Sequence, residues 1–336
     1  MVSSAKSLGV AVIGLGVGRA HVSSFRGSPG VEVRVICDID GERSRAAHSL
    51  VPDATISESW YDAVMSPSVD IVVVATPDYL HAEIIECALG AGKHVFAEKP
   101  ICITSSELGR ISKALSMKPE CKFSANMVLR ANPILIDLYR SIRSSELGVI
   151  SHFEASYLYG RFHKVTAGWR GQPPRYSAML GGGIHMIDLC LWLSGERPTS
   201  VYGVGNSAAS ESLGSPIDDF ELAVLRFSRD FTVVVSATMA SSVPHSHVLS
   251  VHGTKKTFVL GPLGCGYLSS DGQTSPDLIE VPQKYERDSI ATTFVDEVLG
   301  RGQSLVSTSD VLDCTAVALA IRESISEKRE ITVRYP

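Results

Sequence analysis

The sequence predicts an α/β protein of two domains: a doubly wound parallel sheet, then an α/β domain with a large open, mainly antiparallel sheet. Three observations predict this class. The first third of the chain alternates continuous apolar runs with helical stretches, as buried parallel strands and their crossover helices do. The later part carries short runs of strand character linked by turn residues, which favours antiparallel strands. The length of 336 residues is enough for about two domains.

Short β-branched runs mark four parallel strands in the first third. The predicted strands are Val10–Ile13, Val31–Ile36, Ile71–Ala75 and His94–Ala97. The helices predicted between and after them are Ala20–Arg26, Glu42–Leu50, Tyr79–Leu89 and Ser105–Leu115. Because crossovers between parallel strands are right-handed, this alternation predicts a doubly wound sheet.

The regular alternation of strands and helices ends near Ala125, so we expect residues 1–126 to form the first domain and residues 127–336 the second. The strands predicted there are His152–Tyr159, Ser200–Val204, Phe220–Phe227, Phe231–Ala237, Val248–Val251 and Thr257–Leu260. The predicted helices are Pro133–Ser141, Ile184–Leu193, Ile290–Leu299 and Asp310–Ser326. The strands are numerous enough for one large antiparallel sheet.

Composition and charge exclude several classes of protein. The net charge of −5 is spread without a basic stripe, so we expect neither a nucleic-acid nor a membrane partner. No uncharged apolar run approaches the ~20 residues of a membrane span. Seven scattered cysteines, without a C-x-x-C pair, favour reduced thiols over disulfides or a zinc site. We therefore expect a soluble, cytoplasmic protein.

A glycine-rich turn directly follows the first predicted strand and opens a helix. Its residues are Gly14, Leu15, Gly16, Val17 and Gly18. Such a turn lets the backbone approach a pyrophosphate at a helix N-terminus, as in a Rossmann domain. Arg19 stands where G-x-G-x-x-G requires glycine, so the motif alone is weak. Asp38, after the second strand, strengthens it, because its carboxylate suits a ribose diol and would repel a 2′-phosphate. The expected cofactor is NAD; Arg43 leaves NADP possible.

Polar residues follow the third and fourth predicted strands at the edge where open α/β sheets bind ligands. Thr76, Pro77 and His81 follow the third strand, and Glu98 and Lys99 follow the fourth. A lysine there can bond a substrate hydroxyl and relay its proton while hydride leaves the same carbon. Positive charge on an oxidised nicotinamide would lower the lysine pKa towards neutrality.

Several segments together resemble the Gfo/Idh/MocA (glucose–fructose oxidoreductase / inositol dehydrogenase) family over nearly the whole length. They are the glycine turn with His21, Ala75-Thr76-Pro77 with His81, Gly90-Ala91-Gly92-Lys93-His94-Val95 leading to Glu98-Lys99-Pro100, and Gly183-Ile184-His185-Met186-Ile187-Asp188. The resemblance implies a Rossmann domain followed by an α/β domain with a large open sheet. It also implies that Lys99 and His185 face nicotinamide and substrate, as the catalytic pair.

The chain departs from the family pattern at one position. The family commonly has an aspartate four residues before the helix histidine, and Gly181 stands there, within Gly181-Gly182-Gly183. Three alternatives follow. Another group, Asp188 or Tyr176, orients His185; this branch uses only Lys99 and His185; or the protein has lost dehydrogenase activity. We also expect the glycine run to adopt positive φ angles that an aspartate tolerates poorly.

Other residues are predicted to contact cofactor or substrate. Asn126 and Arg170 are candidates for the cofactor, Arg170 through a phosphate or carboxamide. The substrate candidates, besides Lys99 and His185, are Tyr159, Arg161, His163, Trp169, Tyr176 and Asp188. Arg161, His163 and Lys164 could hold an anionic sugar. No third ligand accompanies His185 and Asp188, so no metal is expected. His245, His247 and His252 receive no role.

The leading hypothesis is an oxidoreductase that moves a hydride to or from a carbinol carbon of a sugar, cyclitol or nucleotide-sugar. Two alternatives stay open: a redox-neutral enzyme with tightly bound NAD, and a dinucleotide-binding sensor without catalysis. An open sheet needs covering, so we expect a homodimer or homotetramer.

Overall fold

The computed structural model describes residues 7–166, 168–171, 176–212, 217–240, 242–262, 264–269, 277–279 and 288–336. The chain forms two compact units. The first comprises Met1–Val128, Glu286–Leu312 and Pro336, and the second comprises Leu129–Tyr285 and Asp313–Tyr335. The chain first passes from one unit to the other after Val128, two residues beyond the predicted domain boundary. The sequence did not predict that the chain returns to the first unit near its end.

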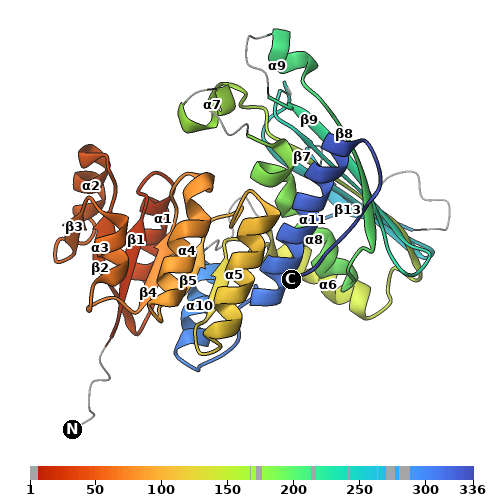
Figure 1. Ribbon diagram of the computed structural model, residues 1–336. Helices are drawn as coiled ribbons and strands as arrows, with labels where there is room; N and C mark the ends of the chain where they lie inside the picture. Colours follow the sequence, from red (N-terminus) through yellow and green to blue (C-terminus); the bar gives the residue numbers. More distant parts are fainter. Residues whose placement is uncertain are drawn as a thin grey trace. The chain divides into compact units, whose positions relative to one another are not determined.

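The first unit contains a six-stranded parallel sheet of order β3-β2-β1-β4-β5-β6 (Figure 1). The strands are β1 (Leu8–Ile13), β2 (Val31–Cys37), β3 (Thr55–Ser57), β4 (Ile71–Val74), β5 (His94–Ala97) and β6 (Phe123–Ala125). Both faces of β4 are fully buried, because helices cover the sheet on each side. Because the strands are parallel, the carboxyl ends of β1, β4, β5 and β6 lie along one edge of the sheet. The predicted polar residues follow the strands at this edge.

Local chemistry explains where the helices of the first unit begin. They are α1 (Gly18–Arg26), α2 (Gly41–His48), α3 (Trp60–Met65), α4 (His81–Gly90), α5 (Ser105–Met117) and α10 (Ser289–Val298). Thr104 and Glu107 form a capping box at α5, and the side chains of Asp40 and Ser59 accept backbone N–H bonds at α2 and α3. The late helix α10 packs here through Phe294, whose ring lies 5.5 Å from that of Phe96 on β5.

The second unit contains a nine-stranded sheet of order β14-β13-β12-β11-β7-β10-β9-β8-β15. Its strands are β7 (Ile150–Leu158), β8 (Ser200–Asn206), β9 (Phe220–Arg226), β10 (Thr232–Thr238), β11 (Ser246–Gly253), β12 (Lys256–Gly261), β13 (Gly264–Ser269), β14 (Asp277–Leu278) and β15 (Ile331–Thr332). Among the described residues, neighbouring strands of this sheet pair antiparallel, except that β7 and β10 pair parallel. The mainly antiparallel sheet is thus confirmed.

Residues of the central strands alternate between buried and half-buried, since helices cover only one face. The helices of this unit are α6 (Pro133–Arg143), α7 (His163–Thr166), α8 (Ile184–Ser194) and α9 (Ala208–Ser212), and α11 (Thr308–Glu327) enters it at Asp313. Ser324 of α11 accepts a bond from the backbone N–H of Gly203 on β8, and α8 packs on β7 and β10. In the described part of the chain, no helix has the length and apolar character needed to cross a membrane.

Candidate active site

The glycine turn between β1 and α1 has the geometry that its sequence predicted. Gly14 has φ of +86°, and an added Cβ would lie 2.5 Å from the carbonyl oxygen of Ala75. A side chain at Gly16 would instead meet only Arg43, at 3.8 Å. Gly14 is therefore required by the turn itself, whereas Gly16 leaves the backbone open to a ligand.

Asp38 lies beside this turn. One carboxylate oxygen accepts a 2.6 Å bond from the N–H of Leu15, and the other accepts one from Asp40 at 2.8 Å. The side chain is 8% exposed, and the next residue, Ile39, is 94% exposed. Arg43 forms an ion pair with Asp40 at 3.3 Å. The turn thus joins N–H donors and a carboxylate to an exposed apolar side chain, a combination that fits an adenosine diphosphate.

His81 ties the end of β4 to the segment after β5. Its ring nitrogens lie 2.8 Å from the carbonyl oxygen of Thr76 and 2.7 Å from that of Pro100, and the side chain is fully buried. This residue therefore positions the Lys99-Pro100 segment, which contains a cis peptide bond. The hydroxyl oxygen of Thr76 is buried and has no hydrogen-bond partner among the described residues. An unsatisfied buried hydroxyl at a strand end fits a polar ligand group there.

Glu98 is the centre of a buried polar network. Its Oε1 lies 2.9 Å from Nε2 of His21 and accepts a 2.8 Å bond from the amide of Asn126, while Oε2 accepts one from the N–H of Lys99. Burial alone would raise the pKa of Glu98, but the hydrogen bond and charge of His21, with Lys99 and Asn126, lower it to about 2. The ionised carboxylate therefore holds Asn126 and the backbone of half-buried Lys99 in place.

In the second unit, a π-helical turn, Met179–Gly183, leads into α8 and places His185 in its first turn. The glycines of this turn make room for aromatic rings. A Cβ at Gly181 would lie 1.9 Å from Oη of Tyr176, and one at Gly182 would lie 2.1 Å from a ring carbon of Tyr157. None of the three glycines has a positive φ, so the prediction of positive φ angles in this run is wrong. The constraint is space that the protein's own rings occupy.

A buried carboxylate binds the start of this turn. Glu221 of β9 accepts bonds from the N–H of Met179 and, at 2.9 Å, from the hydroxyl of Ser177. Burial raises the pKa of Glu221 to about 7, and these two hydrogen bonds limit the rise. No sequence pattern indicates Glu221, because β9 brings it to the turn from 42 residues away.

Two histidines without a predicted role lie near His185. His247 on β11 is paired with Tyr157 on β7, and its ring centroid is 6.2 Å from that of His185. His245 lies 5.2 Å from His247 and 5.6 Å from Tyr159. Burial raises the pKa of Tyr157 above its ordinary range, with Tyr176 as the next cause. Only the strand register, which sequence periodicity does not fix, brings these rings together.

The predicted loop residues of the second unit also gather. The guanidinium of Arg170 lies over the rings of Trp169, at 4.3 Å, and Tyr176, at 5.4 Å. Arg161 lies 5.8 Å from the ring of Tyr159. His163 and Lys164, on the short helix α7, are exposed. Aromatic faces with cationic groups beside them suit a polyol or an anionic sugar.

Asp188 has a different partner from the one considered above. It is 1% exposed, and both carboxylate oxygens accept bonds from Arg130, at 2.7 to 3.2 Å. The guanidinium of Arg130 also lies 5.7 Å from the ring of Trp192. The pair fixes α8, and thereby the helix that carries His185. No pattern in the sequence distinguishes Arg130, which stands three residues before the predicted helix Pro133–Ser141.

Comparisons with known proteins add to this geometry. Residues 8–126 match the model of the oxidoreductase family with an NAD-binding Rossmann fold, and residues 136–259 match the model of the GFO/IDH/MocA C-terminal domain. The chain belongs to the Gfo/Idh/MocA family. It is therefore an NAD-binding oxidoreductase, and the resemblance inferred from the motifs is confirmed.

Relatives in the Gfo/Idh/MocA family include named dehydrogenases. The chain is 23% identical to inositol 2-dehydrogenase of Salmonella paratyphi B, over 81% of this chain and 80% of the relative. It is 27% identical to levoglucosan dehydrogenase of Pseudarthrobacter phenanthrenivorans, over 76% and 73%. A solved levoglucosan dehydrogenase, complexed with NADH and levoglucosan, superposes with a TM-score of 0.84 at 21% identity, covering 98% and 100% of the chains. A scyllo-inositol dehydrogenase from Lactobacillus casei, with NAD(H) and scyllo-inositol, gives 0.82 at 19%, covering 98% and 99%.

Proposed function

We propose that this protein is an NAD-dependent dehydrogenase acting on a secondary alcohol of a sugar, cyclitol or nucleotide-sugar. The observation that carries the proposal is the Glu98-Lys99-Pro100 segment at the end of β5. Its backbone is held by Glu98 and His81, in the same unit as the glycine turn. The names of the relatives, inositol and levoglucosan dehydrogenases, support a polyhydroxylated substrate.

The first unit would hold NAD through the glycine turn and the strand ends. Gly14, Leu15, Gly16, Val17 and Gly18 would contact the pyrophosphate, and Asp38 the adenosine ribose. Thr76, Pro77, Glu98, Lys99 and Asn126 would line the nicotinamide side, with fully buried His81 behind them and Arg170 as a further cofactor contact. When bound, NAD supplies the hydride acceptor or donor. NAD is preferred to NADP in this proposal because Asp38 would repel a 2′-phosphate, although Arg43 lies close enough to Gly16 to weaken that preference.

Lys99 would bond the reacting hydroxyl and move its proton. The neighbouring Glu98 keeps its charge, because its pKa is lowered to about 2, and so serves as a fixed acceptor instead of a proton carrier. His81 would act as a positioning residue, since its ring binds the carbonyl oxygen of Pro100, the residue after Lys99. A lysine whose backbone is held on both sides can keep its amine at one reacting atom.

The second unit would bind the polyol. Tyr159, Arg161, His163, Trp169 and His185 are the proposed substrate contacts, with His185 as the second acid/base. Tyr176 would act in place of the family's aspartate, because its hydroxyl occupies the space into which a side chain at position 181 would extend. Asp188 would position His185 through the helix instead of touching substrate, since Arg130 takes both its oxygens.

We further propose that the protein is a cytoplasmic homodimer or homotetramer. Apolar residues on the uncovered sheet face support self-association, with Tyr202 and Val204 of β8 each 44% exposed. Scattered thiols suit a reducing compartment. Sedimentation analysis of the purified chain tests the oligomer, and a monomer at micromolar concentration would contradict it.

Replacing Lys99 by methionine tests the proposed function. Lys99→Met keeps most of the stem and removes the proton carrier, so turnover should fall by ~10²–10⁴-fold. NADH affinity, measured by fluorescence titration, should stay near that of the parent. Turnover is measured with myo-inositol, levoglucosan and other polyols, and Lys113→Met, an exposed lysine on α5, is the matched control.

Three outcomes separate the alternatives. Parent-like turnover of Lys99→Met would remove this lysine from the reaction. Dinucleotide binding without hydride exchange on any polyol would favour the sensor. Retention of NAD through purification, with a polyol changed but no net reduction, would favour the redox-neutral enzyme.

A further inference from the structure

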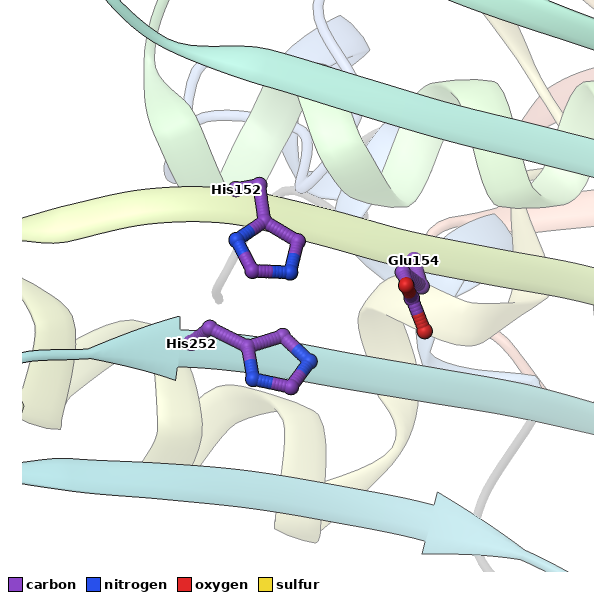
Figure 2. Close-up of side chains that lie close together, drawn as sticks. All are labelled: His152, Glu154 and His252. Atoms are coloured by element: carbon purple, nitrogen blue, oxygen red, sulfur yellow. The ribbon is translucent and has the colours of Figure 1, made fainter.

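Two histidines and a glutamate lie together on the second sheet, away from the residues assigned above. His152 on β7 is paired directly with His252 on β11, and Glu154 follows two residues later on the same face (Figure 2). The intervening Phe153 is 1% exposed and points to the helix-covered face. Because side chains alternate along a strand, His252 and His247 also point to opposite faces. The cluster therefore lies on the face opposite to His185.

The three side chains are close enough to share one ion. One potential ligand atom from each lies within 4.8 Å of the others. The two imidazole rings are nearly parallel, with centroids 4.1 Å apart and an interplanar angle of 5°. Tetrahedral zinc with bonds of ~2.0–2.1 Å places two nitrogen ligands about 3.3 Å apart, so rotation of the half-buried histidine rings and of exposed Glu154 would complete the geometry.

The histidines have the orientation that metal ligands need. Nε2 of His252 is buried and has no hydrogen-bond partner among the described residues. Nδ1 of His152 lies 2.9 Å from the hydroxyl of Ser151, which leaves Nε2 for a ligand. Such an outer contact commonly orients a metal-binding imidazole.

We propose that His152, Glu154 and His252 bind one divalent transition-metal ion of the zinc class. Two imidazole nitrogens and one carboxylate oxygen are ligands that zinc prefers, and water would complete the four-coordinate site. The ion joins adjacent strands β7 and β11 at the centre of the sheet and thereby stabilises the second unit. The proposal is independent of the proposed dehydrogenase activity.

Zinc binding by the full-length protein tests this site. The chelator-stripped chain is titrated with zinc sulfate by calorimetry, and its melting temperature is followed with and without zinc. We expect about one zinc ion per chain and a higher melting temperature with zinc. His152→Gln and His252→Gln should each weaken binding by at least about tenfold, as loss of one of three ligands requires. His48→Gln, a half-exposed histidine on α2, is the matched control and should bind as the parent does.

A second variant decides the matter if the glutamine variants fold poorly. Ser250 is paired with Glu154 across the two strands, so Ser250→His adds a fourth protein ligand to the same cluster while leaving the others in place. It should tighten zinc binding by about tenfold or more. Cobalt substitution should give the visible bands of a nitrogen and oxygen site.

Four results would overturn the proposal. The first is no zinc binding by the parent, and the second is zinc binding by both glutamine variants as tight as that of the parent. The third is no tightening of zinc binding in Ser250→His, and the fourth is a cobalt spectrum dominated by thiolate charge transfer. The last would assign the metal to cysteines.

Discussion

In both units, a glycine-rich segment beside a buried carboxylate precedes a helix, α1 in the first unit and α8 in the second. The glycines of the two segments have different roles. In the first unit, Asp38 accepts a bond from Leu15, and Gly16 keeps open space in front of the backbone. In the second, Glu221 accepts a bond from Met179, and the rings of Tyr176 and Tyr157 occupy the space that a side chain would need. A glycine run therefore indicates close approach to the backbone, and its neighbours decide whether a ligand or the protein itself approaches.

The largest effect is expected at the first turn. Gly14→Ala forces a side chain into a positive φ and against Ala75, so the free energy of unfolding should fall by at least about 2 kcal/mol and NADH binding should be lost. Gly16→Ala should keep parent stability and lose roughly tenfold in NADH affinity, because only the approach of the ligand is blocked. Urea unfolding and NADH titration measure both. Equal stability of the two variants would contradict the different roles assigned to Gly14 and Gly16.

The carboxylate of the second turn should make stability depend on pH. The folded-state pKa of Glu221 is about 7, above the ordinary 4.5. The stability contributed by its neutral form is therefore complete below about pH 4.5 and is lost as pH rises through 7. Up to about 3 kcal/mol of unfolding free energy should disappear over this range.

Urea unfolding between pH 5 and 8 checks this dependence. Glu221→Gln should flatten the profile, whereas Glu120→Gln, an exposed carboxylate, should leave it unchanged. A parent-like slope in Glu221→Gln would show that this carboxylate is ionised in the folded protein.

A smaller effect is expected where the second turn packs against Tyr176. Gly181→Ala and Gly181→Asp should both displace the phenol and lower turnover by about tenfold or more. Tyr176→Phe keeps the ring and removes the hydroxyl, so it separates packing from proton donation. Turnover is compared after circular dichroism has established folding. A well-folded Gly181→Asp that turns over faster than the parent would show that the carboxylate is simply missing here.

The smallest effect concerns cofactor choice. Asp38→Ala should weaken NAD binding by roughly tenfold and narrow its advantage over NADP, because the proposed ribose acceptor and the charge facing a 2′-phosphate are both removed. Titration with both dinucleotides measures the ratio. Tighter NADP binding by the parent protein would reverse the interpretation of Asp38.

The fold was largely predictable because its signals are local. Apolar runs indicated β1, β2, β4 and β5, and the Glu98-Lys99-Pro100 motif indicated one half of the proposed site. Short β3, with two of its three residues exposed, carries too weak a pattern to detect. The parallel pairing of β7 with β10 joins residues about eighty positions apart, and no periodicity encodes such a partner. His247, Arg130 and Glu221 were missed for the same reason, since each reaches its neighbours only through tertiary packing.

The return of the chain to the first unit has a consequence for synthesis on the ribosome. Ser124, in the middle of β6, donates a bond to the carbonyl of Val306, 182 residues later, and Asp288 accepts one from Ser24. The buried ring of Phe294 also belongs to this core. A nascent chain that has just finished β6 therefore lacks part of the dinucleotide-binding unit. The unit can be completed only after strands β7 to β14 of the second sheet have been synthesised, so the two units mature nearly together.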